Sequence, residues 1–397
     1  MGFVLDLSGS PHIGMDKAGP VISSWLPMEG DSGLNPHERL RCCQGSGRHP
    51  PTKHALRGKP MYSLKHDVDL CRTCPTGDCL VKCQYLDVDK DTAVTEMVKI
   101  GRGEDSFVLQ DCVTCYACEE YCQRGNYPFY LITEKREEKG ILTSPRAITR
   151  QWINIGEPQG KFRLGEVKEK ALSFGFMPEF LKWAKGRLFE DVMPSFIFGQ
   201  EFFCNVVYIH FANTSIIKER LPMVLDNFRK LRVKEVIFLH DECYGAFAHL
   251  APAYGMEVPF KPVHYFEYLY NRLTELKDLI RPLNIRAVYQ RPCSSRLSPD
   301  KHRFVGEIMD LIGVDLVERE YQDHNALCCG GIYAMSFGYD LAHDVQKRNM
   351  DDMEGHGAQV CIFNCPACMG SIGTQVAKRG IRPIHMIHLC RMAIGEI

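Results

Sequence analysis

The sequence predicts an α/β protein in which a small, mostly helical and cysteine-rich domain precedes a duplicated α/β domain. From residue 202 onward, short β-branched and aromatic runs alternate with amphipathic stretches of helical length, which is typical of α/β domains. Residues 61–150 instead carry eight cysteines in two groups, among segments with a helical pattern. Two parts of the α/β region also resemble each other at nearly constant spacing, which indicates an internal repeat.

Length and composition limit the function classes. The chain has 397 residues, 45% of them hydrophobic, which is enough for two or three packed domains. Its 48 basic and 49 acidic residues give a net charge of -1, so the charge balance favours neither nucleic acid nor an anionic membrane. We expect no membrane span, because no stretch approaches the roughly 18 apolar residues of a membrane helix. The start also lacks the pattern of an export signal, so we expect a cytoplasmic protein. Its 19 cysteines are expected to stay reduced, and the clustered ones among them to hold metal rather than form disulfides.

The first half of the chain divides by composition. Residues 1–60 are rich in Gly, Pro, Ser and His without a helical or strand period, and we expect an irregular extension there. Residues 61–150 form the predicted cysteine-rich domain, with a helix expected over Thr92–Arg102. The charged run Glu134–Lys139 is interpreted as the solvated face of a second helix. Residues 151–201 are predicted to be a helical connector.

Residues 202–397 are predicted to form a two-lobed α/β domain. The segment Ile237–Gly245 aligns with Ile362–Gly370, and Pro262-Val263-His264 resembles Pro383-Ile384-His385 at nearly the same spacing. Two related lobes follow from this repeat. Strands are expected at residues 206–209, 236–239, 287–289 and 360–363.

Eight cysteines of the first domain form two four-cysteine runs, of spacing C-x2-C-x4-C-x3-C and C-x2-C-x2-C-x3-C. The second spacing is that of bacterial ferredoxins, in which three thiolates from one loop hold one cluster and the fourth holds the other cluster. On this rule one 4Fe-4S cluster has the ligands Cys71, Cys74, Cys79 and Cys122, and the other has Cys112, Cys115, Cys118 and Cys83.

A pair of zinc sites is the alternative for these runs, since zinc also takes four thiolates with C-x2-C spacing. Two independent zinc loops would each supply their own four ligands, so a fourth ligand exchanged between the two runs argues against zinc. The four-residue gap after Cys74, and Gln123 where ferredoxins usually place proline, depart from the ferredoxin pattern without removing a ligand.

The run Cys112–Gly125, preceded by Met97–Gly101, resembles the C subunit of heterodisulfide reductase. The resemblance implies a helical, electron-delivering ferredoxin domain.

Five more cysteines form an ordered set with two long gaps: Cys293, Cys328, Cys329, Cys365 and Cys368. A four-ligand zinc site would leave one thiol unused, whereas an iron-sulfur cluster can accept a fifth, bridging thiolate. Gly330 and Gly331 follow the cysteine pair and let the backbone approach a cluster and donate N–H groups to its sulfurs; turn geometry is their other role. A simpler iron-sulfur or zinc centre, or no metal, are the alternatives.

This set resembles the CCG motif of the heterodisulfide reductase B subunit, and the resemblance implies a noncubane 4Fe-4S cluster. The order of the two parts is that of fused, D-type subunits of the heterodisulfide reductase family. The first lobe departs from that pattern, because it keeps only His240-x-x-Cys243 of a second CCG motif. His240 and Cys243 are therefore candidates for additional metal ligands, or else for a vestigial loop.

The resemblance implies an electron-transfer subunit that relays electrons between two cubane clusters and the CCG cluster within a larger redox complex. The expected partner is a flavin-containing heterodisulfide reductase A-like or other redox subunit, because the chain has no G-x-G-x-x-G after a strand and no Walker motif. The layout also resembles the electron-transfer iron-sulfur subunit of class II benzoyl-coenzyme A reductase complexes. The alternatives are a heterodisulfide reductase-like thiol-disulfide oxidoreductase with the CCG cluster as catalytic site, and a metal-stabilised scaffold.

Other residues are assigned simpler roles. Cys42 and Cys43 are interpreted as an isolated pair of thiols. Arg291, His324 and Arg296 flank the CCG cysteines and are expected to offset the negative charge of a thiolate-rich cluster, with the binding of an anionic group as the alternative. Core positions are predicted for Cys204, Cys361 and Cys390.

Overall fold

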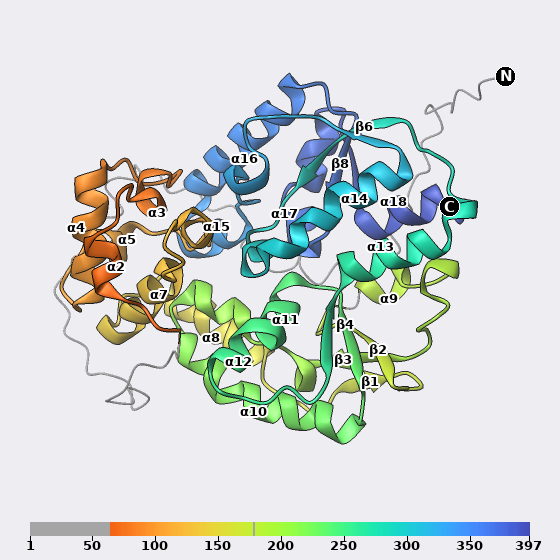
Figure 1. Ribbon diagram of the computed structural model, residues 1–397, viewed down its shortest axis with the longest axis horizontal. Coiled ribbons are helices and arrows are strands. Elements are labelled where there is room, and N and C mark those ends of the chain that lie inside the picture. Colours follow the sequence, from red (N-terminus) through yellow and green to blue (C-terminus); the bar gives the residue numbers. More distant parts are fainter. Residues whose placement is uncertain (1–63, 178) are drawn as a thin grey trace. The chain divides into compact units, whose positions relative to one another are not determined.

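The computed structural model describes residues 64–177 and 179–397 (Figure 1). Cys42, Cys43 and the predicted N-terminal extension lie outside the described residues. The described residues form a helical, cysteine-rich region followed by two parallel sheets with their helices, which confirms the predicted α/β class. Within this part of the chain, no helix is long and apolar enough to cross a membrane.

The cysteine-rich region is helical, as predicted. Its longest helices have regular ends: Asp89 caps α4 by accepting from Thr92 N, and Gly140 ends α7 in the left-handed region. The helix predicted over Thr92–Arg102 corresponds to α4. The helices are α2 (Val68–Arg72), α3 (Asp78–Val81), α4 (Lys90–Gly101), α5 (Val108–Asp111), α6 (Ala117–Tyr121), α7 (Pro128–Lys139) and α8 (Arg146–Ile155).

The charged end of α7 differs from its predicted solvated face. Arg136 is only 1% exposed, and its Nε donates to the carbonyl of Leu109 at 2.6 Å. Glu134 is also buried. Glu137 accepts hydrogen bonds from Thr214 Oγ1 and Ser215 N at the start of a helix in the α/β region, where a carboxylate offsets the helix dipole. The charged run therefore joins two parts of the molecule, and the solvated-face interpretation is wrong for these three side chains.

Two sheets carry the α/β region, each with four parallel strands in the same relative order. The first sheet has the order β1-β3-β2-β4-β5 with β1 antiparallel, and the second has the order β7-β6-β8-β9. The bounds of the first sheet are β1 (Phe162–Leu164), β2 (Lys170–Ser173), β3 (Phe196–Gly199), β4 (Glu235–Phe238) and β5 (Lys261–His264). Those of the second are β6 (Ile285–Gln290), β7 (Val314–Leu316), β8 (Val360–Phe363) and β9 (Arg382–His385).

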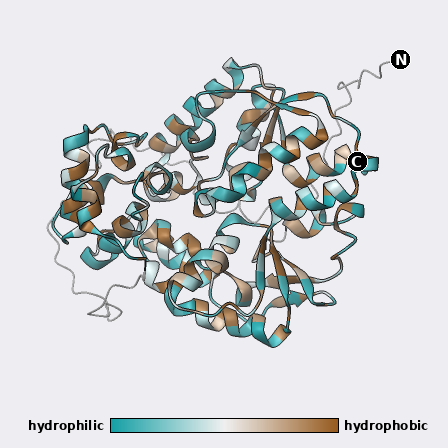
Figure 2. Ribbon diagram, in the orientation of Figure 1, coloured by the Kyte–Doolittle hydropathy of each residue, from teal (hydrophilic) through white to brown (hydrophobic). Residues whose placement is uncertain are grey.

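The larger helices cover these sheets and carry hydrophilic and hydrophobic residues along their lengths (Figure 2). One core joins residues of both sheets, among them Ile237 and Ile362. The helices are α9 (Glu179–Trp183), α10 (Thr214–Leu231), α11 (Asp241–Gly245), α12 (Ala251–Ala253), α13 (Tyr265–Glu275), α14 (Arg303–Ile312), α15 (Gly331–Ser336), α16 (Tyr339–Gly355), α17 (Pro366–Lys378) and α18 (Met386–Ala393).

The structure bears out the internal repeat. His264 accepts from Phe266 N at the start of α13, and His385 accepts from Ile387 N at the start of α18, both at 3.2 Å. The predicted strands at 236–239, 287–289 and 360–363 correspond to β4, β6 and β8. The two histidines that the repeat aligns therefore each cap the helix that follows their strand.

Two secondary-structure predictions were wrong. Residues 206–209 lie in a 3-10 helix, η4 (Val206–Phe211), because this apolar run is buried throughout and a short apolar run does not distinguish a strand from a helix. The predicted helical connector, 151–201, contains β1, β2 and β3, which pair with one another and, through β2, with β4 from later in the chain. The first sheet thus begins before residue 202; the domain boundaries themselves stay a prediction.

Candidate functional site

The structure gathers the first set of predicted cysteines around one cavity. Cys71 lies on α2, Cys74 follows that helix, Cys79 lies on α3 and Cys122 ends α6. All four line the same cavity, together with Gly77, Ala93 and Met97. Cys122 thus meets the cysteines of the other run, as the crossed ferredoxin arrangement predicts.

Nitrogen donors point at the sulfurs of this first set. Gly77 N lies 3.4 Å from Cys74 Sγ, and Asn126 N lies 3.3 Å from Cys122 Sγ. The side chain of Asn126 also donates to Cys71 Sγ at 3.2 Å, and His66 Nε2 is 3.5 Å from the same sulfur. Hydrogen bonds of this kind stabilise thiolates and tune a bound cluster. Sequence reasoning missed Asn126 and His66, because neither belongs to a cysteine spacing.

The second set groups Cys83 with Cys112, Cys115 and Cys118. Burial raises the pKa of Cys83 to about 12, and the nearby Cys115 and Cys112 raise it as well. Burial also raises the pKa of Cys118, with Cys112 and Cys115 as further causes. The loop that carries these thiols has the non-glycine residues Thr114 and Tyr116 at φ 59° and 64°. Such left-handed residues cost energy and often mark functional loops.

All five cysteines of the third set meet where strands of the second sheet end. Cys293 follows β6, Cys328 and Cys329 precede α15, and Cys365 and Cys368 lie at the start of α17. Side-chain hydrogen bonds join Cys293 to Cys328, Cys328 to Cys329, Cys329 to Cys368, and Cys368 to Cys365. Gly330 N lies 3.4 Å from Cys328 Sγ, which is one of the backbone donors expected from the glycine pair. The carboxyl ends of parallel strands are the usual place for a binding site in such sheets.

The chemistry of these donors fits iron-sulfur groups. Every ligand predicted for the three cysteine sets is a thiol, and sulfur-only donor sets suit iron-sulfur clusters and zinc. Burial raises the pKa of Cys79, Cys83 and Cys118, so their thiolates need a compensating positive charge, which iron supplies. Among residues 64–177 and 179–397, no three His, Cys, Asp or Glu side chains are arranged to hold a single metal ion.

The first lobe has a counterpart of the third set in which three of the five positions have changed. His240 begins α11 as Cys365 begins α17. Asn205 begins η4 with φ 62°, as Gly330 begins α15 with φ 75°. The corresponding positions are Phe176 for Cys293, Phe203 for Cys328, Cys204 for Cys329, His240 for Cys365 and Cys243 for Cys368.

Aromatic rings stand where the second lobe has thiols. The ring centroids of Phe176 and Phe203 are 4.5 Å apart at 83°, an edge-to-face contact. Cys204 and Cys243 remain, both buried, with their sulfurs 3.6 Å apart. Cys204 is indeed buried as a core residue, but sequence reasoning missed its relation to the motif. Cys204 precedes Cys329 by the same number of residues as Cys243 precedes Cys368. This equal spacing was the sequence signal that could have assigned Cys204 to the motif.

His240 faces the third set directly. Its Nε2 lies 3.7 Å from Cys365 Sγ, and it also hydrogen-bonds Cys243. The hydrogen bond with Cys204 and, after it, the interaction with His240 outweigh burial and lower the pKa of Cys243 to about 6. His240 therefore lies beside a cysteine of the other lobe and connects it to Cys243.

A buried ion network joins the second and third sets. Glu120 on α6 pairs with Arg291 through two hydrogen bonds, of 2.5 and 3.0 Å, and with Arg296 Nε at 3.2 Å. Both arginine side chains are at most 2% exposed. Arg296 also donates to the carbonyls of Cys115 at 3.5 Å and Ala326 at 2.9 Å. It thus touches the loop of the second set and the segment that leads to Cys328.

The expected role of His324 is not supported, because its exposed side chain makes no contact with the cysteines among the interactions described. Its carbonyl instead accepts from Arg296 Nη2 and from Tyr121 Oη. Arg291 and Arg296 are paired with Glu120, so neither is free to bind an external anion.

The second and third sets are close in space. Cys293 is among the groups that raise the pKa of Cys115, after burial as the main cause. The edge-to-face pair Tyr85 and Tyr333, with ring centroids 5.6 Å apart, lies near both Cys115 and Cys328. The two rings therefore lie beside cysteines of both sets.

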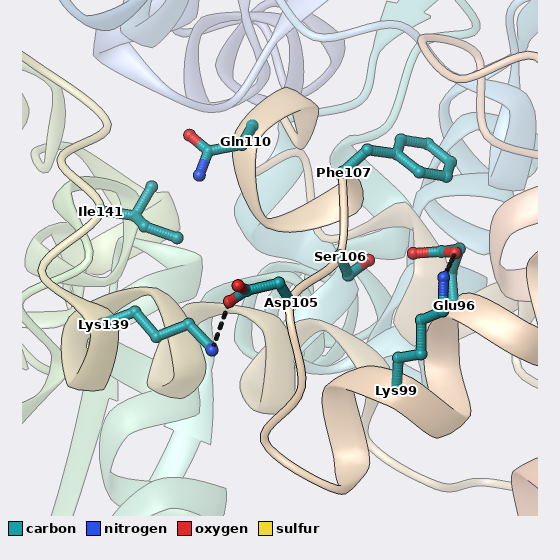
Figure 3. Close-up of a pocket in the computed structure, with 8 residues that line it drawn as sticks. All are labelled: Glu96, Lys99, Asp105, Ser106, Phe107, Gln110, Lys139 and Ile141. Atoms are coloured by element: carbon teal, nitrogen blue, oxygen red, sulfur yellow. Dashed lines mark hydrogen bonds and ion pairs between the residues drawn. The ribbon is translucent and has the colours of Figure 1, made fainter. Parts of the chain in front are cut away.

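A pocket of about 650 Å³ opens elsewhere, between α4, α5 and α7 (Figure 3). Its two lysines are already paired, Lys99 with Glu96 at 2.6 Å and Lys139 with Asp105 at 2.7 Å. No cysteine is among its lining residues, so this pocket is not part of the candidate site.

Comparison with known proteins agrees with the third set. Residues 287–373, which include all five of its cysteines, match the family model CCG, described as a cysteine-rich domain. A search of curated proteins gives no match to the chain. A CCG domain indicates an iron-sulfur redox function. Residues 287–373 are thus similar to the CCG cysteine-rich domain, which is found in heterodisulfide reductase B-like subunits.

Proposed function

We propose that this protein is an iron-sulfur electron-transfer subunit that relays electrons between two cubane 4Fe-4S clusters and a CCG-bound 4Fe-4S cluster. The observation that carries the proposal is the contact between the second and third sets, in which Arg296 binds the Cys115 carbonyl and pairs with Glu120. Iron-sulfur clusters take up and release single electrons, over potentials of roughly -700 to +450 mV.

The ligands are assigned from the three sets. The first cubane cluster takes Cys71, Cys74, Cys79 and Cys122, and the second takes Cys112, Cys115, Cys118 and Cys83. The CCG cluster, proposed to be noncubane, takes Cys293, Cys328, Cys329, Cys365 and Cys368.

The chain's own residues supply the surroundings that electron relay needs. Asn126, Gly77 and Gly330 donate to thiolate sulfurs and thereby stabilise added electrons on a cluster. The buried Glu120, Arg291 and Arg296 fix the two sets relative to each other and leave a net positive charge near thiolates. Tyr333 is buried and, with Tyr85, places apolar rings beside both sets.

The first lobe supports relay over disulfide reduction at two equivalent clusters. Phe176 and Phe203 occupy two ligand positions, so the lobe lacks the donors for a second CCG cluster. We infer that the relay works within a larger cytoplasmic redox complex, with a flavin-containing heterodisulfide reductase A-like or other redox subunit as partner. The class II benzoyl-coenzyme A reductase complexes are a context with this layout.

Iron analysis and electron paramagnetic resonance of anaerobically purified protein test the proposal. We expect about twelve irons per chain and three separate cluster signals. A Cys115→Ser variant should lose the second signal and slow reduction of the CCG cluster, whereas Cys390→Ser, at a buried thiol of α18, should keep all three. Fewer than about eight irons in fully loaded protein would refute the two cubane clusters.

Stopped-flow mixing separates relay from the enzymatic alternative. Reduced protein without any partner should be oxidised slowly by small disulfides. Rapid, repeated turnover of a disulfide would instead assign catalysis to the CCG site and overturn the relay.

A further inference from the structure

Cys204 and Cys243 form a pair of thiols that the relay does not use. Their sulfurs are 3.6 Å apart, although the residues come from different elements. Both are buried, with Cys204 completely enclosed. A disulfide bond is about 2.0 Å long, so the two sulfurs would have to approach each other by about 1.6 Å to form one.

The surroundings keep these two thiols together without a cluster. Their counterparts Cys329 and Cys368 belong to a set of five, but Phe203 and Phe176 replace two further members of that set here. The backbone of Gly175 closes the other side, since a Cβ at this position would lie 3.4 Å from Cys243 Sγ. The remaining donors are therefore two sulfurs in contact and one imidazole.

His240 connects this pair to the CCG site. It hydrogen-bonds Cys243, and its Nε2 lies 3.7 Å from Cys365 Sγ. The buried carboxylate of Glu242 lies near both Cys204 and Cys243. The imidazole of His240 and the carboxylate of Glu242 thus lie beside the two thiols, and His240 also contacts Cys365, a proposed cluster ligand.

We propose that Cys204 and Cys243 are a redox-active dithiol that exchanges two electrons with the CCG site. On oxidation Cys204 and Cys243 together lose two electrons and two protons, and one S–S bond forms between their sulfurs. An iron-sulfur group held by the CCG cysteines would accept the electrons one at a time. The Cys204 proton would pass to the Glu242 carboxylate, and the proton shared by Cys243 and His240 would stay on the imidazole. Reduction reverses each change. The electron exchange rests on the proposed relay, whereas formation of the disulfide does not.

Disulfide mapping tests the pair itself. Full-length, iron-loaded protein is oxidised anaerobically with the thiol oxidant diamide, quenched in acid with N-ethylmaleimide, and digested with trypsin. Cys204 and Cys243 then lie on peptides 188–218 and 235–272, each with a single cysteine. We expect these two peptides to be found linked, and their absence as a linked pair under every oxidising condition would overturn the dithiol.

Two variants control this experiment. Cys204→Ala should abolish the linked pair, and Cys390→Ser, which removes a different buried thiol, should keep it. Circular dichroism and iron content establish that each variant is folded. If Cys204→Ala does not fold, Cys243→Ser serves in its place. In either variant the remaining thiol should be recovered as its N-ethylmaleimide adduct, and its recovery in a disulfide with another cysteine would overturn the specific pairing.

A reductive step tests the connection to the CCG site. Oxidised protein is mixed with reduced methyl viologen, a one-electron donor, and the linked pair is followed with time. It should disappear in the iron-loaded protein and persist in Cys293→Ser, which removes a CCG ligand but not the pair. If the linked pair disappears at the same rate in both proteins, the electron exchange is overturned and the relay is unaffected. If the unmodified protein lacks the clusters, that result counts against the relay instead.

Discussion

Nε2 of His240 lies 3.7 Å from the sulfur of Cys365, so the residue that begins α11 in one lobe contacts the residue that begins α17 in the other. The two positions correspond in the internal repeat. A ligand position that changed to histidine in the first lobe has thus become part of the surroundings of the second lobe's site.

Replacing His240 by leucine should lower the reduction potential of the CCG cluster, on the order of tens of mV. The reason is the loss of a hydrogen bond to a ligand sulfur, which stabilises the reduced cluster. Potentiometric titration followed by electron paramagnetic resonance measures the shift. His356→Leu, at an exposed position, should leave the potential unchanged. An unchanged potential in His240→Leu would mean that the contact is absent in the loaded protein.

Replacing Glu120 by glutamine should destabilise the protein by about 3–5 kcal/mol, because Arg291 and Arg296 would be left as buried charges without their carboxylate. Denaturant unfolding measures the change in the free energy of unfolding. Glu138→Gln, in the partly exposed pair with Lys135, should cost less than about 1 kcal/mol. Similar costs for the two variants would contradict a structural role for the buried network.

Replacing Phe203 by alanine should cost about 3–5 kcal/mol, because the ring is buried and packs against Phe176. The iron content should stay the same, since a cavity adds no thiolate. Phe107→Ala, at a side chain that is 39% exposed, is the matched control and should change stability little. A rise in bound iron in Phe203→Ala would show that the ring alone keeps a cluster out of the first lobe.

Acid should weaken the fold through His385. Burial lowers the pKa of His385 from 6.5 to about 3, so the folded protein keeps it neutral while the unfolded chain protonates it below pH 6.5. The unfolded state binds more protons in that window, and stability therefore falls as the pH falls. At pH 5.5 the loss from this group is about 1.4 kcal/mol relative to neutral and higher pH.

Thermal unfolding between pH 5.5 and 7.5 measures this dependence. A His385→Gln variant should be less stable at neutral pH, because the cap on Ile387 N is altered, but its stability should depend less on pH. Parallel pH profiles for the two proteins would assign the acid sensitivity to other groups.

The cysteine spacings by themselves predicted which thiols come together. A run with two or three residues between cysteines lets one loop present several thiols to one point, and this local rule led to the crossed partner Cys122. The set Cys293 to Cys368 was likewise visible, because its two long gaps match a known motif, and the strands at 236–239 and 360–363 were visible because each is a contiguous apolar run.

Only the tertiary structure decided what surrounds those thiols. The strand β2, the ring pair Phe176 and Phe203, and the salt bridges of Glu120 depend on partners far along the chain. No cysteine spacing in its neighbourhood singled out Cys204. Its role became apparent only from the fold, which places its sulfur 3.6 Å from that of Cys243. The spacing of ligands can be read along the chain. The burial of the thiols, the salt bridges of Glu120 and the closeness of the second and third cysteine sets arise instead from the packing of the helical region and the two lobes.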